Sequence, residues 1–490
     1  MSAQVLLDRQ KFLQLVAERR EPWDLAIVGG GATGVGIAVD AATRGYSVVL
    51  LEQHDFGKGT SSRSTKLVHG GVRYLQQGNL SLVMEALKER GMLLQNAPHI
   101  VHDQQFIVPN YEWWEAPFYG IGMKIYDLLA GKYGFGPSQI LSREEVLERI
   151  PTLSQDGLRG GVKYHDGQFD DARLLIDLVS TAAEHGATLL NYTRVTSLLK
   201  DADGLINGLT CQDQETGVAY QLAARCVINA TGPFCDELRK LDDPNAASMI
   251  SPSQGVHLVL PRHFLPGETA IMVPHTRDGR VMFAVPWLGQ AVIGTTDTAI
   301  PDAPLEPSPK SEEIDFILET ASGYLSRPPT RSDILSVFTG IRPLVKASDV
   351  EATSALSRDH TISISSSGLL TIAGGKWTTY RRMAEDAVDH AIVLARLEER
   401  DCVTRTLRIH KPDQDVPTAA WFARYEMART VEDVLARRTR VLFLDAHATV
   451  KMAPAVAKEL ALELGRDEAW QRAQLDDFAK VAEHFLPPKG

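Results

Sequence analysis

The sequence of 490 residues has few cysteines, no excess of basic residues and no long apolar segment. Its four cysteines form no Cys-x-x-Cys pair and show no metal-ligand spacing with histidine, so neither a disulfide framework nor a metal site is expected. Acidic residues outnumber basic ones by 62 to 51, and the net charge of −11 argues against a broad nucleic-acid-binding surface. This balance still allows a local basic pocket for an anionic metabolite.

Features of a membrane-spanning or secreted chain are also missing from the sequence. The uncharged stretch Leu25–Val39 is 15 residues long, whereas a spanning helix needs roughly 20 apolar residues. Residues 1–20 mix charged and apolar side chains, so no cleavable signal is expected there. A hydrophobic content of 44% and a charged content of 23% are ordinary for a globular protein of two or three domains. Peripheral attachment to a membrane stays open.

The most informative stretch is the glycine-rich turn that follows a predicted strand at residues 24–28. Glycines at positions 29, 31 and 34 permit a tight strand-to-helix turn and the close approach of a pyrophosphate. The helix that follows presents its N-terminal N–H groups to the phosphates. A second predicted strand, Val48–Leu51, ends on Glu52, whose carboxylate can accept hydrogen bonds from ribose hydroxyls. A turn packed for structural reasons alone would leave Glu52 unexplained, so the sequence predicts a dinucleotide site.

The remaining pattern predicts an α/β fold with a β-rich second part and a helical C-terminal part. Helices are expected at residues 9–20, 80–96 and 170–186, and buried strands at 187–192, 225–229 and 369–373. Short β-rich segments at 256–260, 270–274, 281–286 and 291–295 suggest a mostly antiparallel sheet in a second, capping domain. From residue 386 onward the pattern is helical.

Several longer motifs carry a resemblance to a known family. They are SS-x-S-x-KL-x-HGG-x-RYL at 61–75, DDARL at 170–174, NATGP at 229–233, GTTD at 294–297, G-x-RPL at 340–344, SRDH at 357–360 and GGK-x-TTYR at 374–381. With these motifs the chain resembles the FAD-dependent glycerol-3-phosphate dehydrogenases of the aerobic, quinone-linked type, over roughly residues 20–395. The resemblance resumes at 426–445, after a segment that is shorter here than is usual in the family. That departure leaves open any partner, oligomer or membrane contact made through the C-terminal part.

The resemblance implies a discontinuous Rossmann-like FAD-binding domain, of the glutathione-reductase type, at residues 1–105, 165–250 and 330–385. It further implies a substrate cap at 106–164 and 251–329 and a shortened helical domain at 386–490. The implied reaction is oxidation of sn-glycerol 3-phosphate to dihydroxyacetone phosphate, with hydride transfer from C2 to flavin N5 and electrons passed to a quinone. Such an enzyme is expected in the cytoplasm. Peripheral attachment to the inner face of the cytoplasmic membrane and a homodimer both stay open. FAD is expected to be non-covalent, because no histidine or cysteine stands in a recognisable flavin-attachment motif.

The substrate-binding residues implied by the resemblance are Arg73, Tyr74, His257, Arg342, Arg358 and Lys376. Arginine suits a phosphate because its planar fork donates two parallel charged hydrogen bonds. Lys376 would stabilise negative charge on the flavin ring, although a lysine at a helix start can also simply face solvent. His257 is the candidate general base, since histidine titrates near neutral pH; a hydrogen bond to substrate or a purely structural role stays open. The predicted catalytic residues are His257, Arg342 and Lys376.

The predicted FAD-binding residues lie in the glycine turn, at the end of the second predicted strand and in the family motifs. They are Gly29, Gly31, Ala32, Thr33, Gly34, Glu52, Gln53, Thr60, Ser61, Ser62, Lys66, Leu67, His69, Gly70, Gly71, Ala230, Thr231, Gly232, Gly340, Gly374, Gly375, Lys376, Trp377 and Thr378.

Three other functions remain compatible with a dinucleotide fold. An oxidase of the same fold would return electrons to O2, and it could act on glycerol 3-phosphate or on another 2-hydroxy or amine substrate. A NAD-linked dehydrogenase would need a self-contained N-terminal nucleotide half, and a non-catalytic flavin-binding module would have no use for Arg342, Arg358 and Lys376 together. The aromatic segment 113–132 predicts either a packed helix of the cap or a membrane-surface helix with tryptophan and tyrosine beside lysines.

Overall fold

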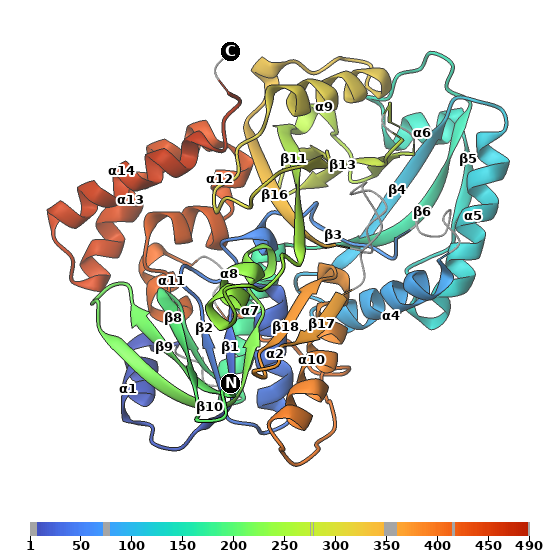
Figure 1. The fold of residues 1–490 in the computed structure, drawn as a ribbon. Coiled ribbons are helices and arrows are strands. Elements are labelled where there is room, and N and C mark those ends of the chain that lie inside the picture. Colours follow the sequence, from blue (N-terminus) through green and yellow to red (C-terminus); the bar gives the residue numbers. More distant parts are fainter. Residues whose placement is uncertain are drawn as a thin grey trace.

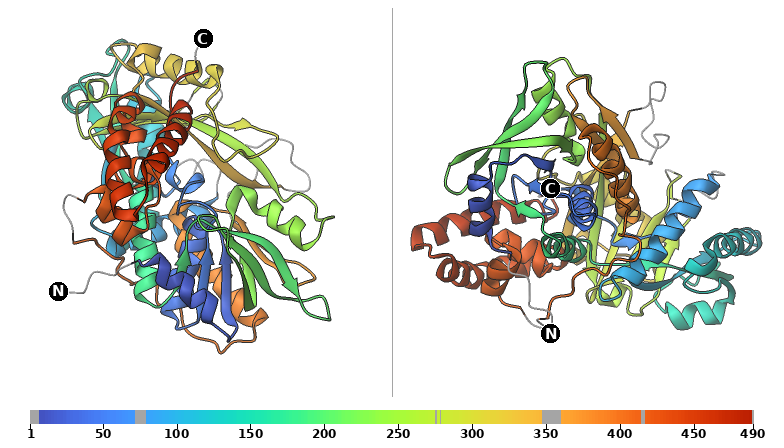
Figure 2. Two further views of the ribbon diagram at one scale, coloured as in Figure 1. Left: turned by 90° about the vertical axis from the view of Figure 1, so that its left-hand side faces the viewer. Right: turned by 90° about the horizontal axis from the view of Figure 1, so that it is seen from below.

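In the computed structural model the chain is built around two β-sheets, with helices at its C-terminal end on one side (Figure 1). The structure describes residues 7–71, 79–274, 276–277, 279–346, 360–413 and 417–488. Figure 2 places the helices α13 and α14 at one side of the molecule and α5 at the opposite side. The predicted α/β fold with a β-rich second part and a helical C-terminal part is confirmed.

The first sheet contains the strands predicted at residues 24–28 and 48–51, and β18, β10, β1, β2 and β7 run parallel within it. β17 and the pair β8–β9 join it antiparallel. Its strand order is β17-β18-β10-β1-β2-β7, and β8 and β9 extend it through β10. Leu25 and Ile27 face one hydrophobic core, and Ala26 and Val28 face another. A sheet buried on both faces explains why its strands are continuous apolar runs rather than alternating ones. The strands are β1 (Trp23–Val28), β2 (Val48–Leu51), β7 (Thr188–Leu190), β8 (Thr193–Lys200), β9 (Ile206–Asp213), β10 (Ala219–Asn229), β17 (His360–Ile364) and β18 (Leu370–Gly374).

The second sheet is mostly antiparallel, as the β-rich pattern within residues 256–297 predicted. The predicted segments correspond to β11, β12, β13 and β14, and each neighbouring pair in the order β11-β14-β13-β12 is antiparallel. At one end of this group β12 pairs in parallel with β4, and at the other end β11 pairs antiparallel with β15 and β16. The strands are β3 (Leu67–Val68), β4 (His102–Asn110), β5 (Gln139–Ser142), β6 (Gly160–Gln168), β11 (Ile250–Pro261), β12 (Ala270–Val273), β13 (Met282–Trp287), β14 (Gln290–Gly294), β15 (Thr298–Ala299) and β16 (Ser336–Val345).

Sheet membership divides the chain differently from the expected domain boundaries. Residues 1–105 and 330–385 were expected in the FAD-binding part, yet β3 and β16 belong to the second sheet. β16 pairs with β11 along its whole length, from Ser336 to Val345. The apolar pattern of a buried strand does not specify which sheet the strand joins. The domain boundaries stay a prediction.

The helices lie around these two sheets. The predicted helices near residues 9–20, 80–96 and 170–186 are confirmed as α1, α4 and α7, and the Asp170 side chain caps α7 by accepting from two backbone N–H groups. α2, α7 and α10 share a hydrophobic core with the first sheet. The α-helices are α1 (Arg9–Glu18), α2 (Ala32–Thr43), α4 (Leu80–Asn96), α5 (Glu115–Ala130), α6 (Arg143–Arg149), α7 (Asp171–Glu184), α8 (Cys235–Asp242), α9 (Ser311–Tyr324), α10 (Tyr380–Leu394), α11 (Ala419–Glu426), α12 (Val441–Leu444), α13 (Ala446–Leu464) and α14 (Glu468–Glu483).

Candidate functional site

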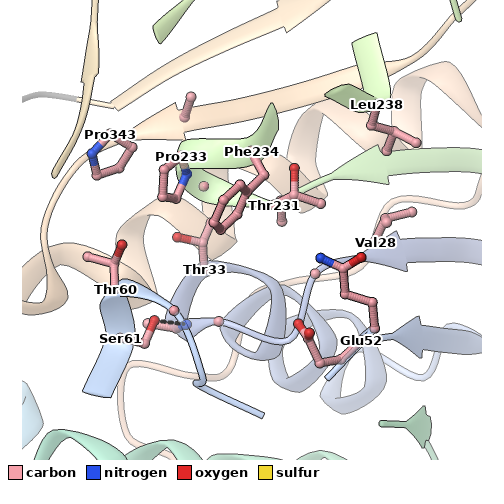
Figure 3. Close-up of a pocket in the computed structure, with 18 of the residues that line it drawn as sticks. Val28, Thr33, Glu52, Thr60, Ser61, Thr231, Pro233, Phe234, Leu238 and Pro343 are labelled. Atoms are coloured by element: carbon pink, nitrogen blue, oxygen red, sulfur yellow. Dashed lines mark hydrogen bonds between the residues drawn. The ribbon is translucent and has the colours of Figure 1, made fainter. Parts of the chain in front are cut away.

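A cavity of about 320 Å³ lies at the carboxyl ends of β1 and β2, beside the N-terminus of α2 (Figure 3). Gly29 has a φ of +109°, and a Cβ on Gly34 would lie 1.9 Å from the Gly29 carbonyl oxygen. The turn therefore requires glycine at both positions. Ala32 and Thr33 bring the positive end of the α2 dipole to the cavity wall, where it favours an anion.

Glu52 lines this first cavity at the end of β2. Its Oε2 accepts the Gly30 N–H at 2.7 Å, and its Oε1 accepts the His54 N–H at 2.8 Å. Burial raises the pKa of the Glu52 carboxyl, while these two N–H donors act in the opposite direction. The carboxylate thus holds the glycine turn in place from the cavity wall. Its contact with a ribose stays a prediction.

A short 3-10 turn, η1 (Thr60–Ser62), connects the first cavity to the second sheet. The Ser61 Oγ accepts the Ala32 N–H at 2.9 Å, and the Ser61 carbonyl accepts the Trp377 Nε1–H at 2.8 Å. The Thr60 hydroxyl donates to the Ile341 carbonyl of β16 at 2.6 Å. Two motifs more than 300 residues apart in sequence are therefore joined by hydrogen bonds at this turn.

A second cavity, of about 290 Å³, adjoins the first one. Both cavities are lined by Thr60, Pro343, Gly374, Gly375, Lys376 and Trp377. His257, Arg342 and Lys376, the three predicted catalytic residues, all line the second cavity. The structure thus brings together side chains from β11, from β16 and from the turn after β18.

Arg342 reaches the second cavity from β16. Its guanidinium donates to the Thr296 carbonyl at 2.8 Å and lies 3.3 Å from the Asp297 carboxylate. A Cβ on Gly255 would lie 2.4 Å from the guanidinium, so the absence of a side chain there makes room for Arg342. The side chain is 23% exposed, which leaves part of it open to the cavity. A fixed, partly exposed guanidinium is suited to a phosphate.

His257 is almost fully buried in β11 and stacks on Phe338 of β16, with ring centroids 4.7 Å apart. Its Nε2 shares a hydrogen bond of 2.9 Å with the Thr65 hydroxyl. Burial lowers the pKa of His257 well below its usual value, and the positive charges of Lys66 and Arg342 lower it further. The imidazole is therefore neutral at neutral pH and able to accept a proton.

Lys376 follows two glycines that both have positive φ angles, +80° at Gly374 and +73° at Gly375. The turn ends β18 and leads into the 3-10 turn η7 (Trp377–Thr379). Lys376 lines both cavities, so its ammonium group lies where a ligand shared between the two would pass.

Most of the predicted cofactor residues lie at one of the two cavities. The first is lined by Gly29, Gly31, Ala32, Thr33, Glu52, Gln53, Thr60, Ser61, Ala230, Thr231, Gly232, Gly374, Gly375, Lys376 and Trp377. The second is lined by Leu67, His69, Gly71, Gly340 and Thr378, and also by Thr60, Gly374, Gly375, Lys376 and Trp377, which line both cavities. Gly34, Ser62, Lys66 and Gly70 line neither. Arg73, Tyr74 and Arg358 lie outside the described residues.

Comparison with protein-family models gives two matches that together cover most of the chain. Residues 24–381 match the FAD dependent oxidoreductase family, and residues 391–471 match the C-terminal domain of alpha-glycerophosphate oxidase. The chain belongs to the FAD-dependent oxidoreductase family. The glycine turn, Glu52 and the turn after β18 all lie within the first match.

Individual relatives of this FAD-dependent oxidoreductase align with most of the chain. The mitochondrial glycerol-3-phosphate dehydrogenase of Arabidopsis thaliana is 39% identical, over 98% of this chain and 89% of the relative. The corresponding human enzyme is 46% identical, over 77% of this chain and 54% of the relative. Among solved structures, the glycerol-3-phosphate dehydrogenase from Bacillus halodurans complexed with FAD has a TM-score of 0.80 and 28% identity, covering 98% of both chains. The Arabidopsis alignment spans 560 positions, so that relative has stretches without counterparts here.

The residues around the first cavity fit FAD, the cofactor of this family. The glycine turn and the α2 N-terminus suit a pyrophosphate, and Glu52 lies at the strand end where a ribose is held. The cavity continues to the turn after β18 and joins the second one there, as a dinucleotide with its reactive ring next to a substrate site requires.

Lys66 was predicted to contact the cofactor, but the structure places it behind the site. It is fully buried, and its Nζ donates to Asp171 at 2.7 Å and to the Ser62 carbonyl at 2.8 Å. Burial lowers the pKa of Lys66 to about 7, whereas Asp171 raises it. Ser62 also lies on this side of the turn, so Lys66 and Ser62 support the site from behind.

Four charged residues that line the second cavity were missed by the sequence analysis, namely Arg63, Asp166, Arg280 and Asp297. Asp297 contacts Arg342 and lies 4.0 Å from Arg280, a further arginine in the cavity wall. Asp297 is the last residue of the GTTD motif, so the motif could have identified it as a site residue. Arg280 stands in an ordinary Asp-Gly-Arg turn, so the sequence contained no signal for it.

Proposed function

We propose that this protein oxidises sn-glycerol 3-phosphate at C2 to dihydroxyacetone phosphate and that the electrons pass to a quinone. The observation that supports this most directly is the second cavity, where a fixed guanidinium, an ammonium group and a neutral imidazole surround a space that adjoins the FAD site. The relatives named glycerol-3-phosphate dehydrogenase support the same substrate.

Each of these side chains has a distinct part in the proposed reaction. Arg342 binds the substrate phosphate, together with the predicted contacts of Arg73, Tyr74 and Arg358. His257 accepts the proton of the C2 hydroxyl, since it is neutral at neutral pH. Lys376 places a positive charge between the FAD site and the substrate. FAD, when bound, supplies the acceptor for the C2 hydride, and we propose that it is held non-covalently.

Anaerobic addition of glycerol 3-phosphate to the purified yellow protein tests this function. We expect the visible flavin absorbance to be lost with glycerol 3-phosphate and retained with glycerol or inorganic phosphate. A quinone analogue should then restore the absorbance, whereas O2 should do so slowly and with little hydrogen peroxide. Acid precipitation should release the flavin from the polypeptide. No bleaching by glycerol 3-phosphate would refute the proposed substrate, and fast peroxide formation would identify an oxidase.

The surface of α5 supports a membrane contact for the proposed quinone reaction. Its inward face buries Tyr119, Met123, Tyr126 and Ala130. Its outward face nevertheless exposes Phe118, Ile121, Ile125 and Leu128, and Trp113 and Ile140 are exposed nearby. A helix that is apolar on both faces is normally covered on both, and tryptophan with lysine suits the lipid headgroup region. Among the described residues, no helix is long and apolar enough to cross a bilayer. We propose that this face rests on the membrane surface.

Charges placed on the outward face of α5 should weaken binding to lipid vesicles. Ile121 and Leu128 are 65% and 79% exposed, so Ile121→Glu with Leu128→Glu should not disturb the core. We expect vesicle binding to fall at least about tenfold, because two apolar side chains that would be buried in the membrane surface are replaced by charges that anionic lipids repel. The measurement is cosedimentation with vesicles of phosphatidylethanolamine and phosphatidylglycerol.

The matched control for this experiment is Leu462→Glu on α13. Leu462 is 86% exposed, and α13 lies on the opposite side of the molecule from α5 (Figure 1). It should bind vesicles as the parent does. Equal binding by the α5 variant and the parent would remove this face as the membrane contact.

A further inference from the structure

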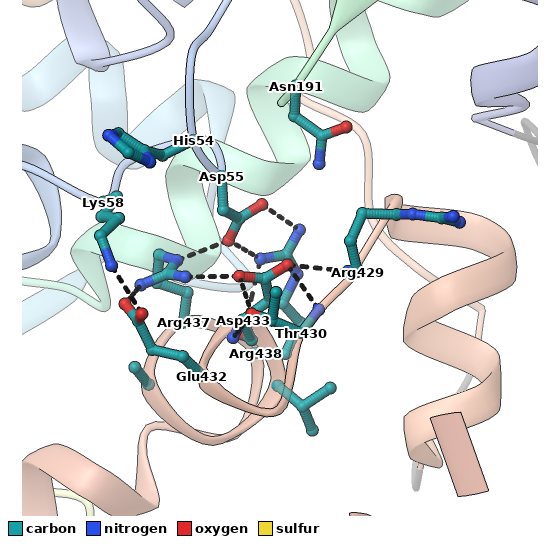
Figure 4. Close-up of polar contacts among 12 residues, drawn as sticks. His54, Asp55, Lys58, Asn191, Arg429, Thr430, Glu432, Asp433, Arg437 and Arg438 are labelled. Atoms are coloured by element: carbon teal, nitrogen blue, oxygen red, sulfur yellow. Dashed lines mark hydrogen bonds and ion pairs between the residues drawn. The ribbon is translucent and has the colours of Figure 1, made fainter. Parts of the chain in front are cut away.

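Residues 432–440, which we call the arginine segment, lie against the FAD-binding loop at residues 52–69 (Figure 4). Arg437 and Arg438 both contact the carboxylate of Asp55, three residues after Glu52. Arg437 Nε lies 2.5 Å from Asp55 Oδ2, and Arg438 NH2 lies 3.0 Å from Asp55 Oδ1. The end of the loop nearest Glu52 is therefore held by two guanidinium groups from the C-terminal part of the chain.

The other end of the loop is held by Arg440 of the same segment. Its NH2 donates to the Ser62 carbonyl at 2.9 Å and to the Asp171 carboxylate at 2.8 Å. Ser62 belongs to η1, whose Ser61 contacts both α2 and Trp377. Asp171 also pairs with Lys66, so one buried charge cluster fixes the back of this turn.

A third contact reaches the cavity wall itself. Lys58 lines the first cavity, and its Nζ lies 2.5 Å from the Glu432 carboxylate. Glu432 in turn accepts from Arg437 at 2.6 Å. The contact between Lys58 and Glu432 therefore links the arginine segment to the wall of the cavity assigned to FAD.

These contacts are buried and depend on an unusual backbone. The side chains of Asp55, Arg437, Arg438 and Arg440 are at most 2% exposed. Residues Asp433–Arg438 form a π-helix, and Arg440 has a φ of +64°. π-Helical turns are rare and often occur at functional sites. Burial alone would raise the pKa of the Asp55 carboxyl, but Arg438 and Arg437 hold it below its usual range. Loss of Asp55 would remove one of the buried carboxylates that balance Arg437 and Arg438.

We propose that the arginine segment holds residues 52–69 in their FAD-binding conformation, so that FAD binding and docking of the C-terminal helices stabilise each other. Arg437, Arg438 and Arg440 are thereby positioning residues for the cofactor rather than contacts with it. The coupling is reciprocal, because a segment that raises FAD affinity must itself be stabilised by FAD to the same degree. This inference rests on FAD occupying the first cavity.

Hydrogen–deuterium exchange of the full-length parent tests the reciprocal coupling without any substitution. The expected result is slower amide exchange of residues 432–440 in the FAD-bound protein than in the apoprotein, together with slower exchange at residues 29–34. Protection at the glycine turn with no change in the arginine segment would overturn the proposal. Absence of FAD binding by the parent would instead refute the proposed function.

Variants of the segment test its effect on FAD affinity. Glu432→Gln keeps the side-chain volume but loses the charge that Lys58 and Arg437 share, and Asp55→Asn does the same at the centre of the cluster. We expect the FAD dissociation constant, from quenching of flavin fluorescence by apoprotein, to rise about tenfold or more in each. If Asp55→Asn fails to fold, the Glu432→Gln variant and the exchange experiment still test whether the arginine segment supports FAD binding.

Arg424→Ala is the matched control, since Arg424 pairs with Glu463 inside the C-terminal domain and its side chain is 53% exposed. The Arg424→Ala variant should bind FAD as tightly as the parent does. Folded Glu432→Gln protein that binds FAD as tightly as the parent would overturn the proposal. Such protein would still be bleached by glycerol 3-phosphate, so the proposed function would stand.

Discussion

Replacement of His257 by glutamine should lower kcat for glycerol 3-phosphate by about 10²- to 10⁴-fold, the range expected when a general base is removed. Glutamine can still bond to the Thr65 hydroxyl, but it cannot take the proton of the C2 hydroxyl. FAD should remain bound, because His257 lines only the second cavity. The measurements are steady-state turnover with a dye acceptor and the flavin absorbance of the purified variant.

The pH dependence of the parent provides a second test of the same role. Burial and the charges of Lys66 and Arg342 hold the pKa of His257 well below 6.5, so the base is unprotonated at neutral pH. As pH falls, protonation should reduce turnover only when pH approaches this lowered pKa. We therefore expect kcat at saturating substrate to show no inflection in the ordinary histidine range. An inflection there, or a His257→Gln variant with parental kcat, would assign the base to another group.

Replacement of Arg342 by alanine should damage turnover of glycerol 3-phosphate far more than turnover of glycerol. Loss of a charge-assisted hydrogen bond corresponds to roughly 1.5–3 kcal/mol, or about 10- to 150-fold in kcat/KM. Arg342→Lys should also be impaired, because a lysine keeps the charge but loses the fork. Glycerol should be a very poor substrate of the parent, since binding of the remote phosphate orients C2. The measurement is kcat/KM for both substrates in parent and variants.

Arg331→Ala serves as the arginine control for this comparison. Arg331 contacts Asp315 at the protein surface and lines neither cavity. It should leave both kcat/KM values unchanged. An equal loss on the two substrates in Arg342→Ala would mean that Arg342 supports the fold or the FAD site, and Arg280 would become the first candidate for the phosphate contact.

The parts of the site that follow from local sequence were predictable. Gly29, Gly34 and Glu52 are specified by a turn whose geometry tolerates few other residues, and they lie together as expected. Gly374 and Gly375 were identified from the GGK-x-TTYR motif, and the structure gives both of them the positive φ angles that favour glycine. The motif resemblance predicted His257, Arg342 and Lys376 as one site, and the structure places these residues from three distant segments at one cavity.

Features set by tertiary contacts were not predictable. Lys66 resembles any motif lysine in sequence, yet its ion pair with Asp171, a carboxylate that also pairs with Arg440, places it in a buried cluster. The sheet to which β16 belongs depends on its pairing with β11, and no local pattern encodes that pairing. Exposure of the outer face of α5 is equally invisible in sequence, because apolar residues occur on both faces of that helix.

The arginine segment also has a consequence for the order of events during synthesis. Arg437 and Asp55 are 382 positions apart, and ribosomes add about 5–20 residues per second, so roughly 20 to 75 s separate their appearance. During that interval the nascent glycine turn exists without the guanidinium groups that hold its neighbouring loop. On the proposed coupling, stable insertion of the flavin is a late step, completed only when residues 432–440 have emerged and folded back on the FAD-binding loop.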